Sequence, residues 1–573
     1  MIRPIQQLRL MGIFAFVSAC GPTEPSGSNA FVSAPSPGFR HDNGYASRYY
    51  FPETFGSGVA LFDANSDGHL DLYAVQGGPV PGSPEAAAYS GALPTNQLYF
   101  GDGTGTLRDA TSQAGDAADA NFGMGAHVGD VNGDGLPDLF VTNVGADSLL
   151  IATGDDLAMY ARTTATTFDV NQWSTAAGFA DFDRDGHLDL VVVGYARWSA
   201  VNHVDCIADG GNDYCDVKMY DGIQDHVFRG DGAGGFSDKS EAWQFGLLPG
   251  RGLGTALTDF DDDGFVDIYV ANDTEANRYY KNNRGAGFLD HTDLSGTSSN
   301  SDGRFEAGMG VAVANISGNG LADIVVTNFT SESNNLFENL GQSRFRERSR
   351  LAGIAKASIP KLAFGVTLQD FDLNGQEDLF TACGHVLRHI EARVSTWSWR
   401  QSDQLLLNGD NQHFTEFAPG ELFETPRVGR GLASGDLDED GAPDLIVSNS
   451  GDDLIVGLNR LDSLRGFANG VSKGDRWLLL NVKQAASPTN TNTSAIGAKV
   501  TLSVDDGSVQ TRWIRAGTGY LSQDDQRPHF GIPRGKAVSS IQIRWPDGVT
   551  TQYSATELKG LGSLNQVLTI RRE

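Results

Sequence analysis

Short apolar segments alternate with loops rich in aspartate and glycine along most of the chain. Ahead of each loop lies a stretch of small and apolar residues, such as GSGVALF before Asp63 and TAAGFA before Asp181. Behind it lies a run of β-favouring residues, such as LYAV after Asp71 and LVVV after Asp189. Apolar runs of this length between turn-forming residues predict β-strands rather than helices. We therefore expect repeated strand–loop–strand units.

The loop between two such strands recurs seven times as a nine-residue pattern. We name the copies loops 1 to 7, and they run over 63–71, 130–138, 181–189, 259–267, 315–323, 370–378 and 436–444. A second hairpin pattern follows most copies, so that each unit predicts about four strands. Seven such units can close into a ring, which protects their strand edges. The alternative is a linear array of hairpins, but isolated hairpins are only marginally stable in water.

The predicted fold is all-β and has two parts. A chain of 573 residues is too long for a single core, so at least two domains are expected. Residues 41–465 are predicted to form a seven-bladed β-propeller. Residues 472–573 are predicted to form a small C-terminal β-rich domain, because segments such as KVTLSV and IQIRWP alternate apolar and polar positions.

The loop pattern places oxygen atoms around one centre. Positions 1, 3, 5 and 9 carry side-chain oxygens, position 6 is a glycine that permits a positive φ, and position 7 offers its backbone carbonyl. Hard oxygen donors in this number suit Ca²⁺ better than Mg²⁺. We therefore predict calcium in six loops, with these ligands: Asp63, Asn65, Asp67, His69, Asp71, Asp130, Asn132, Asp134, Leu136, Asp138, Asp181, Asp183, Asp185, His187, Asp189, Asp259, Asp261, Asp263, Phe265, Asp267, Asp370, Asp372, Asn374, Gln376, Asp378, Asp436, Asp438, Asp440, Ala442 and Asp444.

A simpler explanation of the loops is that Asp-Gly and Asn-Gly form turns without any ion. Turn formation alone does not require acids at positions 1, 3 and 9 as well. Loop 5 is an internal control, because it offers Asn315, Ser317 and Asn319 and keeps only Asp323 as an acid. We predict that loop 5 is empty or weak, and that calcium in the other loops has a structural role.

The first forty residues have the features of an export signal and a tether. Residues 1–19 combine Arg3 and Arg9 with a short apolar run, and VSAC ending at Cys20 resembles a bacterial lipobox. We expect a lipoprotein signal peptide over 1–19, lipidation of Cys20, and a flexible Pro/Ser/Gly tether over 20–40. The alternative is a plain secretory signal. The expected location is the cell envelope, as an outer-membrane lipoprotein or at the cell surface, with the lipid as the only membrane contact.

The remaining cysteines and the net charge narrow the possibilities further. Cys206 and Cys215 lie in one loop, and in an oxidising compartment a local disulfide is the simplest interpretation, with a metal pair as the alternative. Cys383 follows an apolar run and is expected to be a buried thiol. The net charge of −30 argues against nucleic acid as a partner, since phosphate binding needs clustered basic residues.

Several long motifs resemble known families. The repeats resemble the FG-GAP/VCBS repeats of integrin α-type propellers, and YYFPETFGSGVALFDANSDGHLDLYAVQGG from Tyr49 and DGRFEAGMGV from Asp302 resemble bacterial relatives of cartilage acidic protein. AIGAKVTL from Ala495 and RAGTGYLSQDDQRPHFGI from Arg515 resemble the ASPIC/UnbV domain. The resemblance implies an extracytoplasmic, calcium-binding protein that is adhesion-like or binds a ligand. Loop 5 departs from the family's acidic pattern.

The function expected from these features is binding rather than catalysis. The partner is predicted to be an extracellular or envelope protein or a glycan, and its surface to be the long insertions 77–95, 196–220 and 384–401. The alternative is a calcium-stabilised propeller enzyme acting on carbohydrate, of the lyase or dehydratase type. We predict no catalytic residue, because the sequence has no HExxH, GxSxG or phosphate-loop motif.

Two groups of residues keep two interpretations open. For the aromatic side chains of the insertion 384–401, packing at the rim is the favoured interpretation, and stacking on sugars is the alternative. These residues are His385, His389, Trp397 and Trp399. In the C-terminal domain, a polar site and a packing role are equally compatible with the pattern of Tyr520, Asp524, Asp525 and His529.

Overall fold

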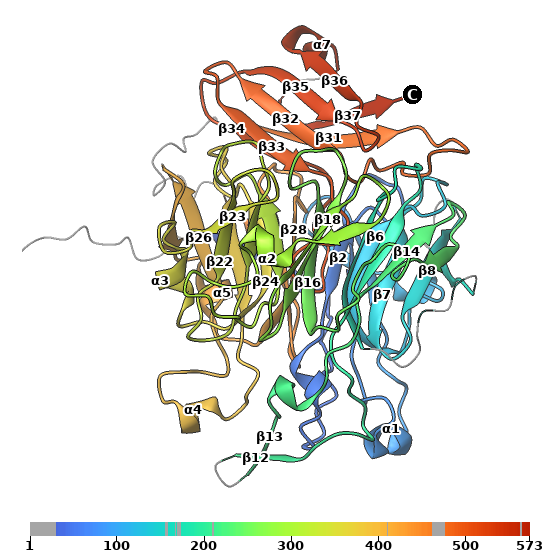
Figure 1. Cartoon of the computed structure of the whole chain (residues 1–573), viewed down its shortest axis with the longest axis vertical. Helices are drawn as coiled ribbons and strands as arrows, with labels where there is room; N and C mark the ends of the chain where they lie inside the picture. The colour runs from blue at the N-terminus through green and yellow to red at the C-terminus, as the bar shows by residue number, and fades with distance from the viewer. Residues whose placement is uncertain are drawn as a thin grey trace, which may run out of the picture.

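The structure is a computed structural model, shown in Figure 1. It describes residues 30–154, 159–164, 166, 168, 173–208, 211–409, 411–460, 476–561 and 564–573. The predicted signal peptide, the predicted lipidation site Cys20 and tether residues 21–29 lie outside the described residues. Within the described part, no helix has the length and apolar character needed to cross a membrane.

The described residues of the repeat region form seven four-stranded antiparallel sheets, which we number as blades in chain order. Blade 1 contains β2 (Val59–Phe62), β3 (Asp71–Ala74), β4 (Gln97–Gly101) and β5 (Leu107–Asp109). Blade 2 contains β6 (Phe122–Gly129), β7 (Asp138–Val144), β8 (Ser148–Thr153) and β9 (Met159–Arg162). Blade 3 contains β10 (Ser174–Ala180), β11 (Asp189–Gly194), β14 (His226–Gly230) and β15 (Phe236–Asp238).

The second half of the repeat region follows the same scheme. Blade 4 contains β16 (Gly252–Thr258), β17 (Asp267–Asn272), β18 (Arg278–Asn282) and β19 (Phe288–Asp290). Blade 5 contains β20 (Val311–Ala314), β21 (Asp323–Val326), β22 (Asn335–Asn339) and β23 (Phe345–Glu347). Blade 6 contains β24 (Ala363–Gln369), β25 (Asp378–Cys383), β26 (Gln404–Gly409) and β27 (His413–Phe417). Blade 7 contains β28 (Gly429–Gly435), β29 (Asp444–Asn449), β30 (Ile455–Asn459) and β1 (Phe31–Ser33).

The blades are arranged as a closed ring. The first strand of each blade contacts the first strand of the next, from β2 through β6, β10, β16, β20 and β24 to β28, and β28 in turn contacts β2. The edge that a linear array would expose is therefore absent from the innermost layer. The all-β prediction is confirmed.

The apolar runs are continuous because most strands lie between two neighbouring blades. In β11, Val191 packs with Leu257 and Ile268 of blade 4. Its neighbour Leu190 packs with Phe140 of blade 2. Since successive side chains point to opposite faces of a strand, a strand covered on both faces needs apolar residues at every position. This is why LVVV shows no alternation.

The N-terminal boundary of the ring corrects the predicted tether. The flexible tether was expected to extend to residue 40, but β1 pairs with β30 and is the outermost strand of blade 7. Phe31 is 1% exposed and its ring lies 5.8 Å from that of Phe371 and 5.3 Å from that of Phe423. The Pro, Ser and Gly content of this segment predicted a tether, yet Phe31 anchors it to the ring. Burial of one Phe side chain stabilises a fold by about 1.5–3 kcal/mol.

In the described residues 476–561 and 564–573, the C-terminal domain shows two sheets and the helix α7. One sheet has the order β34 (His529–Ile532), β31 (Arg476–Gln484), β37 (Val567–Arg572), and β31 and β37 are parallel. The other has the order β33 (Val509–Trp513), β32 (Lys499–Val504), β35 (Val538–Arg544), β36 (Thr550–Ser554), and α7 (Ala555–Leu561) follows it. Figure 1 shows this domain, in orange and red, covering one face of the ring.

Short helices and one extra hairpin lie outside the blades. The hairpin pairs β12 (Cys206–Ala208) with β13 (Gly211–Asp213). The helices are η1 (Phe51–Thr54), α1 (Pro84–Ala88), η2 (Thr111–Gln113), η3 (Val217–Met219), α2 (Thr292–Ser295), α3 (Ile354–Ser358), α4 (Ile390–Arg393) and α5 (Glu421–Glu424). In Figure 1, α1, the β12–β13 hairpin and α4 project from the face opposite the C-terminal domain, which we call the insertion face.

Candidate metal loops and their surroundings

Each of the seven loops joins the first strand of a blade to the second. The predicted left-handed glycine at position 6 is present throughout, with φ of +90° at Gly186 and +82° at Gly320 of the degenerate loop 5. Its backbone N–H donates to the side chain at position 1 in every loop, for example from Gly186 to Asp181 (2.9 Å) and from Gly320 to Asn315 (3.0 Å). The turn therefore forms whether position 1 is an acid or an amide.

The aspartate at position 9 has a separate role in all seven loops. It accepts one backbone N–H from position 2 or 3 and another from the third strand of the blade. Asp189, for example, accepts from Phe182 (2.9 Å) and Gly230 (3.0 Å). Asp323 in loop 5 accepts from Ser317 (2.6 Å) and Asn339 (2.7 Å). Position 9 thus ties the loop to the blade, which explains why loop 5 keeps this acid alone.

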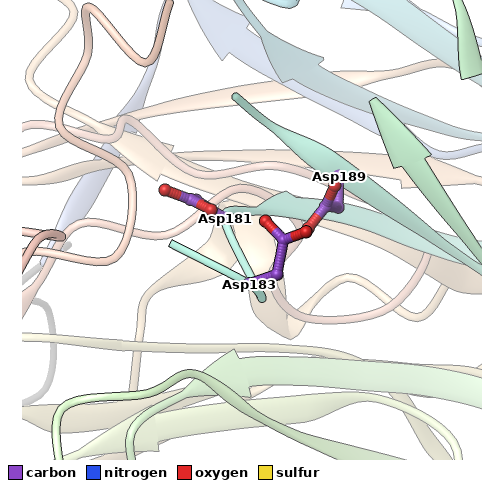
Figure 2. A group of neighbouring side chains, drawn as sticks. All are labelled: Asp181, Asp183 and Asp189. Atoms are coloured by element: carbon purple, nitrogen blue, oxygen red, sulfur yellow. The ribbon is translucent and has the colours of Figure 1, made fainter. Parts of the chain in front are cut away.

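Four loops gather carboxylates tightly enough to hold a cation. In loops 3, 4, 6 and 7, three aspartates each offer one oxygen, and these oxygens lie within 4.8 Å of one another. Figure 2 shows the group in loop 3, formed by Asp181, Asp183 and Asp189. The other three groups are Asp259, Asp261 and Asp263; Asp370, Asp372 and Asp378; and Asp436, Asp438 and Asp444.

Loops 1 and 2 are arranged differently from these four. Their asparagine at position 3 donates its side-chain N–H to the acid at position 5, over 2.9 Å both from Asn65 to Asp67 and from Asn132 to Asp134. The amide supplies within the loop a partner that a carboxylate at the same position cannot offer. The structure therefore separates the six predicted calcium loops into four with a carboxylate cluster and two with an internal amide–acid contact.

The clustered acids are strained electrostatically. Burial, together with the charges of the neighbouring acids of each loop, raises the pKa of Asp181 to about 7 and that of Asp436 to about 8. Burial and the charge of Asp372 raise the pKa of Asp370 well above its usual value. A buried carboxylate favours its neutral form unless a positive charge lies close. These groups are therefore ready to gain stability from a cation.

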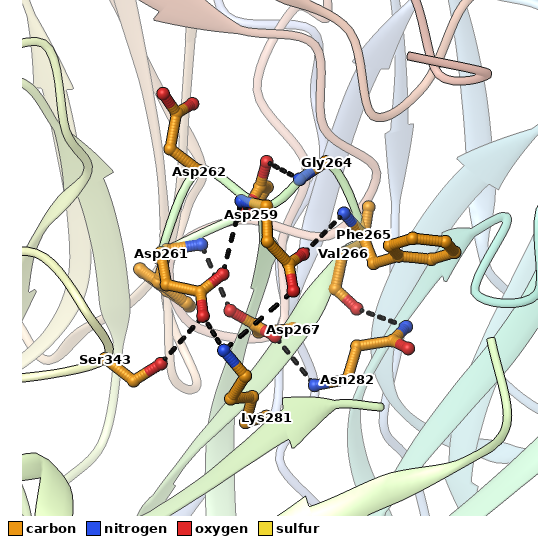
Figure 3. A network of polar contacts seen from close by, with 12 residues as sticks. Asp259, Asp261, Asp262, Gly264, Phe265, Val266, Asp267, Lys281, Asn282 and Ser343 are labelled. Atoms are coloured by element: carbon orange, nitrogen blue, oxygen red, sulfur yellow. Dashed lines mark hydrogen bonds and ion pairs between the residues drawn. The ribbon is translucent and has the colours of Figure 1, made fainter. Parts of the chain in front are cut away.

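Basic side chains already approach three of the four clusters. Arg229 on β14 contacts Asp183 of loop 3 (2.6 Å), and Arg460 contacts Asp438 of loop 7 (2.8 Å). In loop 4, Lys281 on β18 contacts Asp261, as Figure 3 shows. In loop 6 the basic residue from the C-terminal domain, Arg512, pairs instead with Glu377 at position 8 (3.1 Å).

The donor set fits a hard divalent cation. In loop 7 the Oδ1 atoms of Asp436 and Asp438 are buried and have no hydrogen-bond partner among the described residues. A buried unpartnered carboxylate oxygen is costly, and a metal ion is one of the few partners that satisfies several at once. All donors are oxygens, which matches Ca²⁺. The carbonyls predicted to ligate belong to position-7 residues, whose N–H groups donate to position 5, as from His187 to Asp185 (2.9 Å).

Comparison with known families agrees with the two-part architecture. The family model described as FG-GAP-like repeat matches residues 63–141, 130–192 and 259–326, and the model described as ASPIC and UnbV matches residues 488–571. The chain therefore contains FG-GAP-like repeats and a C-terminal ASPIC and UnbV domain. The three segments matched by the FG-GAP-like repeat model together contain loops 1 to 5, including the degenerate loop 5.

Curated relatives resemble about half of the chain. It is 29% identical over 328 residues to cartilage acidic protein 1 of Xenopus tropicalis, which covers 56% of this chain and 45% of the relative. It is 28% identical over 311 residues to the human protein of the same name, which covers 53% and 42%. The chain thus spans less than half the length of these relatives.

Among solved structures, the rhamnogalacturonan lyase YesW aligns with 75% of this chain and 76% of its own, at 10% identity and a TM-score of 0.37. A likeness of this size supports no conclusion about function.

The ASPIC and UnbV domain lies directly on the acidic loops. Thr493 donates to Asp130 of loop 2 (2.5 Å), and the Thr491 N–H donates to the Gly186 carbonyl of loop 3 (2.8 Å). Arg544 and Lys499 reach Asp262 of loop 4, both at 2.9 Å. The loops therefore form the interface between the two domains, which the sequence did not indicate.

The segment 515–527 of the ASPIC and UnbV domain enters the centre of the ring as a plug. Gly519 exchanges backbone hydrogen bonds with Val311 of blade 5 (3.0 and 2.9 Å), and Gln523 does so with Val59 and Leu61 of blade 1. Tyr520 is fully buried, and its ring lies 4.9 Å from that of Phe364. The plug thus joins innermost strands of blades on opposite sides of the ring.

A signal for this plug exists in the repeated glycines that precede the loops. A Cβ at Gly58 would lie 2.0 Å from the Leu521 carbonyl, and a Cβ at Gly178 would lie 2.5 Å from the Ala516 carbonyl. Glycine in a strand often marks the close approach of another backbone. Gly58 of GSGVALF and Gly178 of TAAGFA are therefore contact points for the plug.

The C-terminal residues whose role was open have structural positions. Asp524 accepts from Ser434 (2.9 Å) and Thr367 (3.1 Å), and Asp525 pairs with Arg527 (2.9 Å). His529 contacts the Gly441 carbonyl of loop 7 (2.9 Å), and burial lowers its pKa to about 4, so its ring is neutral. These contacts favour the packing interpretation.

The aromatic residues of the insertion 384–401 are partly covered. The Trp399 ring lies under two guanidinium groups, those of Arg388 (4.8 Å) and Arg400 (5.1 Å). The Trp397 ring lies 5.8 Å from that of His385. This arrangement favours rings packed at the rim. His389 precedes α4 in the same insertion.

The predictions for Cys206, Cys215 and Cys383 are confirmed, whereas lipidation of Cys20 stays a prediction. Cys206 and Cys215 form a disulfide across a Cα–Cα distance of 5.3 Å on the insertion face, and Cys383 is a buried thiol.

Proposed function

We propose that this protein is an exported, calcium-stabilised binding protein that presents the insertion face of its ring to an envelope protein or glycan. The proposal includes attachment through a lipid at Cys20, which the lipobox-like VSAC supports. Basic residues are few against a net charge of −30, which disfavours nucleic acid. We further propose that it is not an enzyme.

One observation carries the calcium assignment. The carboxylates of Asp370, Asp372 and Asp378 in loop 6 are at most 1% exposed, yet their oxygens cluster within 4.8 Å. Burial raises the pKa of both Asp370 and Asp378, and each is raised further by neighbouring acids. Three buried acids in contact destabilise the fold when they are charged, and a cation that offsets their repulsion removes this cost.

The residues around the loops prepare such a site. Backbone N–H groups orient the acids at positions 1 and 9, so these two side chains lose less rotamer entropy when an ion is bound. A bound calcium ion would cancel the repulsion among the carboxylates and convert its binding energy into folding energy. The C-terminal domain rests on the same loops, so their rigidity also fixes the domain interface.

Removal of divalent cations tests this proposal. We expect excess EDTA to lower the melting temperature of the mature protein strongly, and added Ca²⁺ to restore it, because at 100 times its Kd a single site contributes about 2.7 kcal/mol. The measurement is calorimetry with and without chelator, together with the calcium content after dialysis. An unchanged melting curve would contradict the structural role of calcium.

A paired variant locates the effect. Asp372→Asn in loop 6 should remove about one calcium ion per chain, whereas Asn319→Ala in loop 5 should leave the calcium content unchanged. Equal calcium content in both variants would show that loop 6 does not bind.

The binding role needs its own experiment. We expect a glycan and envelope-protein screen with the calcium-loaded mature protein to yield a ligand whose binding depends on the insertion face. The second candidate, a carbohydrate-active enzyme, is tested on the same glycans by following product formation. Turnover of any glycan would replace the binding role with catalysis.

A further inference from the structure

A cavity of about 380 Å³ lies inside the ring beneath the insertion face. Its wall comes from η1, from residues 214–217 of one insertion, from the ends of β17 and β21, and from residues 386–393 of another. Most of the lining is apolar, and it includes Phe51, Phe55, Met309, Phe329 and Phe364. The cavity therefore has a preformed apolar interior, as small-ligand sites generally do.

Two carboxylates from adjacent blades share this apolar wall. Asp273 follows β17, and its Oδ2 accepts a hydrogen bond from the Tyr195 hydroxyl (2.7 Å). Glu332 follows β21, and its Oε2 accepts the Ala307 N–H (2.9 Å). Hydrogen bonds to other residues of the ring therefore hold both carboxylates in place.

The carboxylates lie in an environment that disfavours their charge. Burial raises the pKa of Asp273 to about 6 and that of Glu332 to about 7, and the charge of Asp273 also raises the pKa of Glu332. Arg251 pairs with Glu275, although its charge also acts to lower the pKa of Asp273, and Arg393 pairs with Asp213. A cation bound in the cavity would favour the ionised forms of Asp273 and Glu332, because an opposite charge close by offsets the effect of burial.

The geometry points to a binding site in this cavity for an ammonium or guanidinium group carried on a short apolar stem. The inference rests on the proposed binding role and names the ligand class and the face. The cation would meet Asp273 and Glu332, while the stem would contact the phenylalanine rings, which also attract cations through their faces.

The lining of the cavity disfavours sugars and anions as ligands. A sugar presents many hydroxyl groups, each of which needs a hydrogen-bond partner, whereas most of this wall is hydrocarbon. An anion would face two carboxylates. The buried Arg430 does not change this, because the Phe364 ring covers its guanidinium at 4.0 Å and it donates to the carbonyls of Thr54, Gly384 and Gly429.

The plug limits the size of the ligand. Tyr520 packs with Phe51, Phe55 and Phe364 in one buried cluster, so the central channel is filled beyond the cavity. A chain cannot pass through the ring, and only a small amine or a single Lys or Arg side chain fits a space of this volume.

Calorimetric titration of the calcium-loaded mature protein tests the charge requirement. The probes are n-butylammonium, n-butylguanidinium, butan-1-ol and pentanoate at equal ionic strength. We expect the two cations to bind at least about tenfold more tightly than butan-1-ol, and pentanoate not to bind. Equal binding of butan-1-ol, or binding of pentanoate, would overturn the inference.

Variants test the two carboxylates. Asp273→Asn and Glu332→Gln keep the shape and hydrogen-bond acceptors but remove the charge, and each should weaken n-butylammonium binding about tenfold or more. The control is Asp302→Asn, an exposed acid in the loop before β20, which should bind as the unchanged protein does. Thermal melts check that the variants fold. Folded Asp273→Asn and Glu332→Gln variants with undiminished affinity would disprove the assignment.

Further measurements distinguish a free amine from a side chain presented by a protein. They also distinguish failure of this inference from failure of the proposed function. Tighter binding of N-acetyl-lysine amide than of n-butylammonium indicates a side chain presented by a protein, and the reverse indicates a free amine; both support the inference. If neither cation binds while the glycan and envelope screen yields a ligand, this inference fails and the proposed binding role stands. If the cations bind and the screen is empty, the cavity assignment stands and the envelope partner is wrong.

Discussion

At the scale of single residues, the acids of one loop have different roles although they are the same residue type in the sequence. Position 9 accepts two backbone N–H groups and holds the loop to its blade in all seven copies. Positions 1, 3 and 5 supply the remaining charges, and loop 5 replaces all three of them by Asn315, Ser317 and Asn319. The pattern of loss therefore separates the structural acid from the proposed ion ligands.

The structural role of position 9 can be measured in loop 5, where ion binding is not expected. Asp323→Ala leaves two buried N–H groups without an acceptor and should lower the free energy of unfolding by about 2–4 kcal/mol, equally with and without calcium. Asn315→Ala, which removes only the acceptor of Gly320, should cost about 1 kcal/mol. Denaturant unfolding gives both values. A loss at Asp323 that appears only with calcium would mean that loop 5 binds the ion.

At the scale of elements, the loop is a turn first and an ion site second. The position-6 glycine and its hydrogen bond to position 1 are the same in loop 5 as in the acidic loops. The carboxylate clusters add to this turn and do not create it. In loops 1 and 2 the amide of Asn65 or Asn132 contacts the neighbouring acid, so a single side chain distinguishes these loops from loops 3, 4, 6 and 7.

This view predicts that an ion site can be added to the degenerate loop. The triple variant Asn315→Asp, Ser317→Asp, Asn319→Asp should keep its fold and bind about one more calcium ion per chain than the unchanged protein. It should also be less stable than the unchanged protein in EDTA, because three added acids repel one another. Calcium titration by calorimetry measures the stoichiometry. A variant that folds without gaining an ion would show that the acids are not sufficient.

At the scale of the whole molecule, the C-terminal domain is part of the ring rather than an appendage. Its plug bonds to blades 1 and 5, and its surface rests on loops 2, 3 and 4. The first strand of the chain, β1, closes blade 7 from the other terminus. Both ends of the described chain therefore hold the ring closed.

The plug predicts that the two domains unfold together. Tyr520→Ala removes a fully buried ring at the centre and should lower the free energy of unfolding by about 3–5 kcal/mol. Tyr553→Ala, on the half-buried β36 of the C-terminal domain, serves as the control and should cost less. Scanning calorimetry should show one transition for the unchanged protein. Two well-separated transitions, or an unaffected Tyr520→Ala variant, would argue against a plug that couples the domains.

Much of the fold and of the candidate site was predictable because both depend on local pattern. Strands and loops follow from apolar runs between Asp-Gly turns, and the loop residues of Asp181 to Asp189 meet because nine consecutive residues cannot lie far apart. The Cys206–Cys215 disulfide was predictable for the same reason. The tether prediction was wrong at Phe31, because this apolar residue gains its role only by packing with side chains of blades 6 and 7, hundreds of residues away.

Sequence alone determined the repeat, the all-β class, the turn geometry and which loops are rich in acids. Tertiary structure alone decided that the loops lie beneath the C-terminal domain, that residues 515–527 fill the centre, and that Asp273 and Glu332 meet in one cavity. The physical reason is the closure of the ring. Closure brings together backbone and side chains from blades far apart in sequence, and no local pattern of hydrophobic and polar positions records which of them will meet.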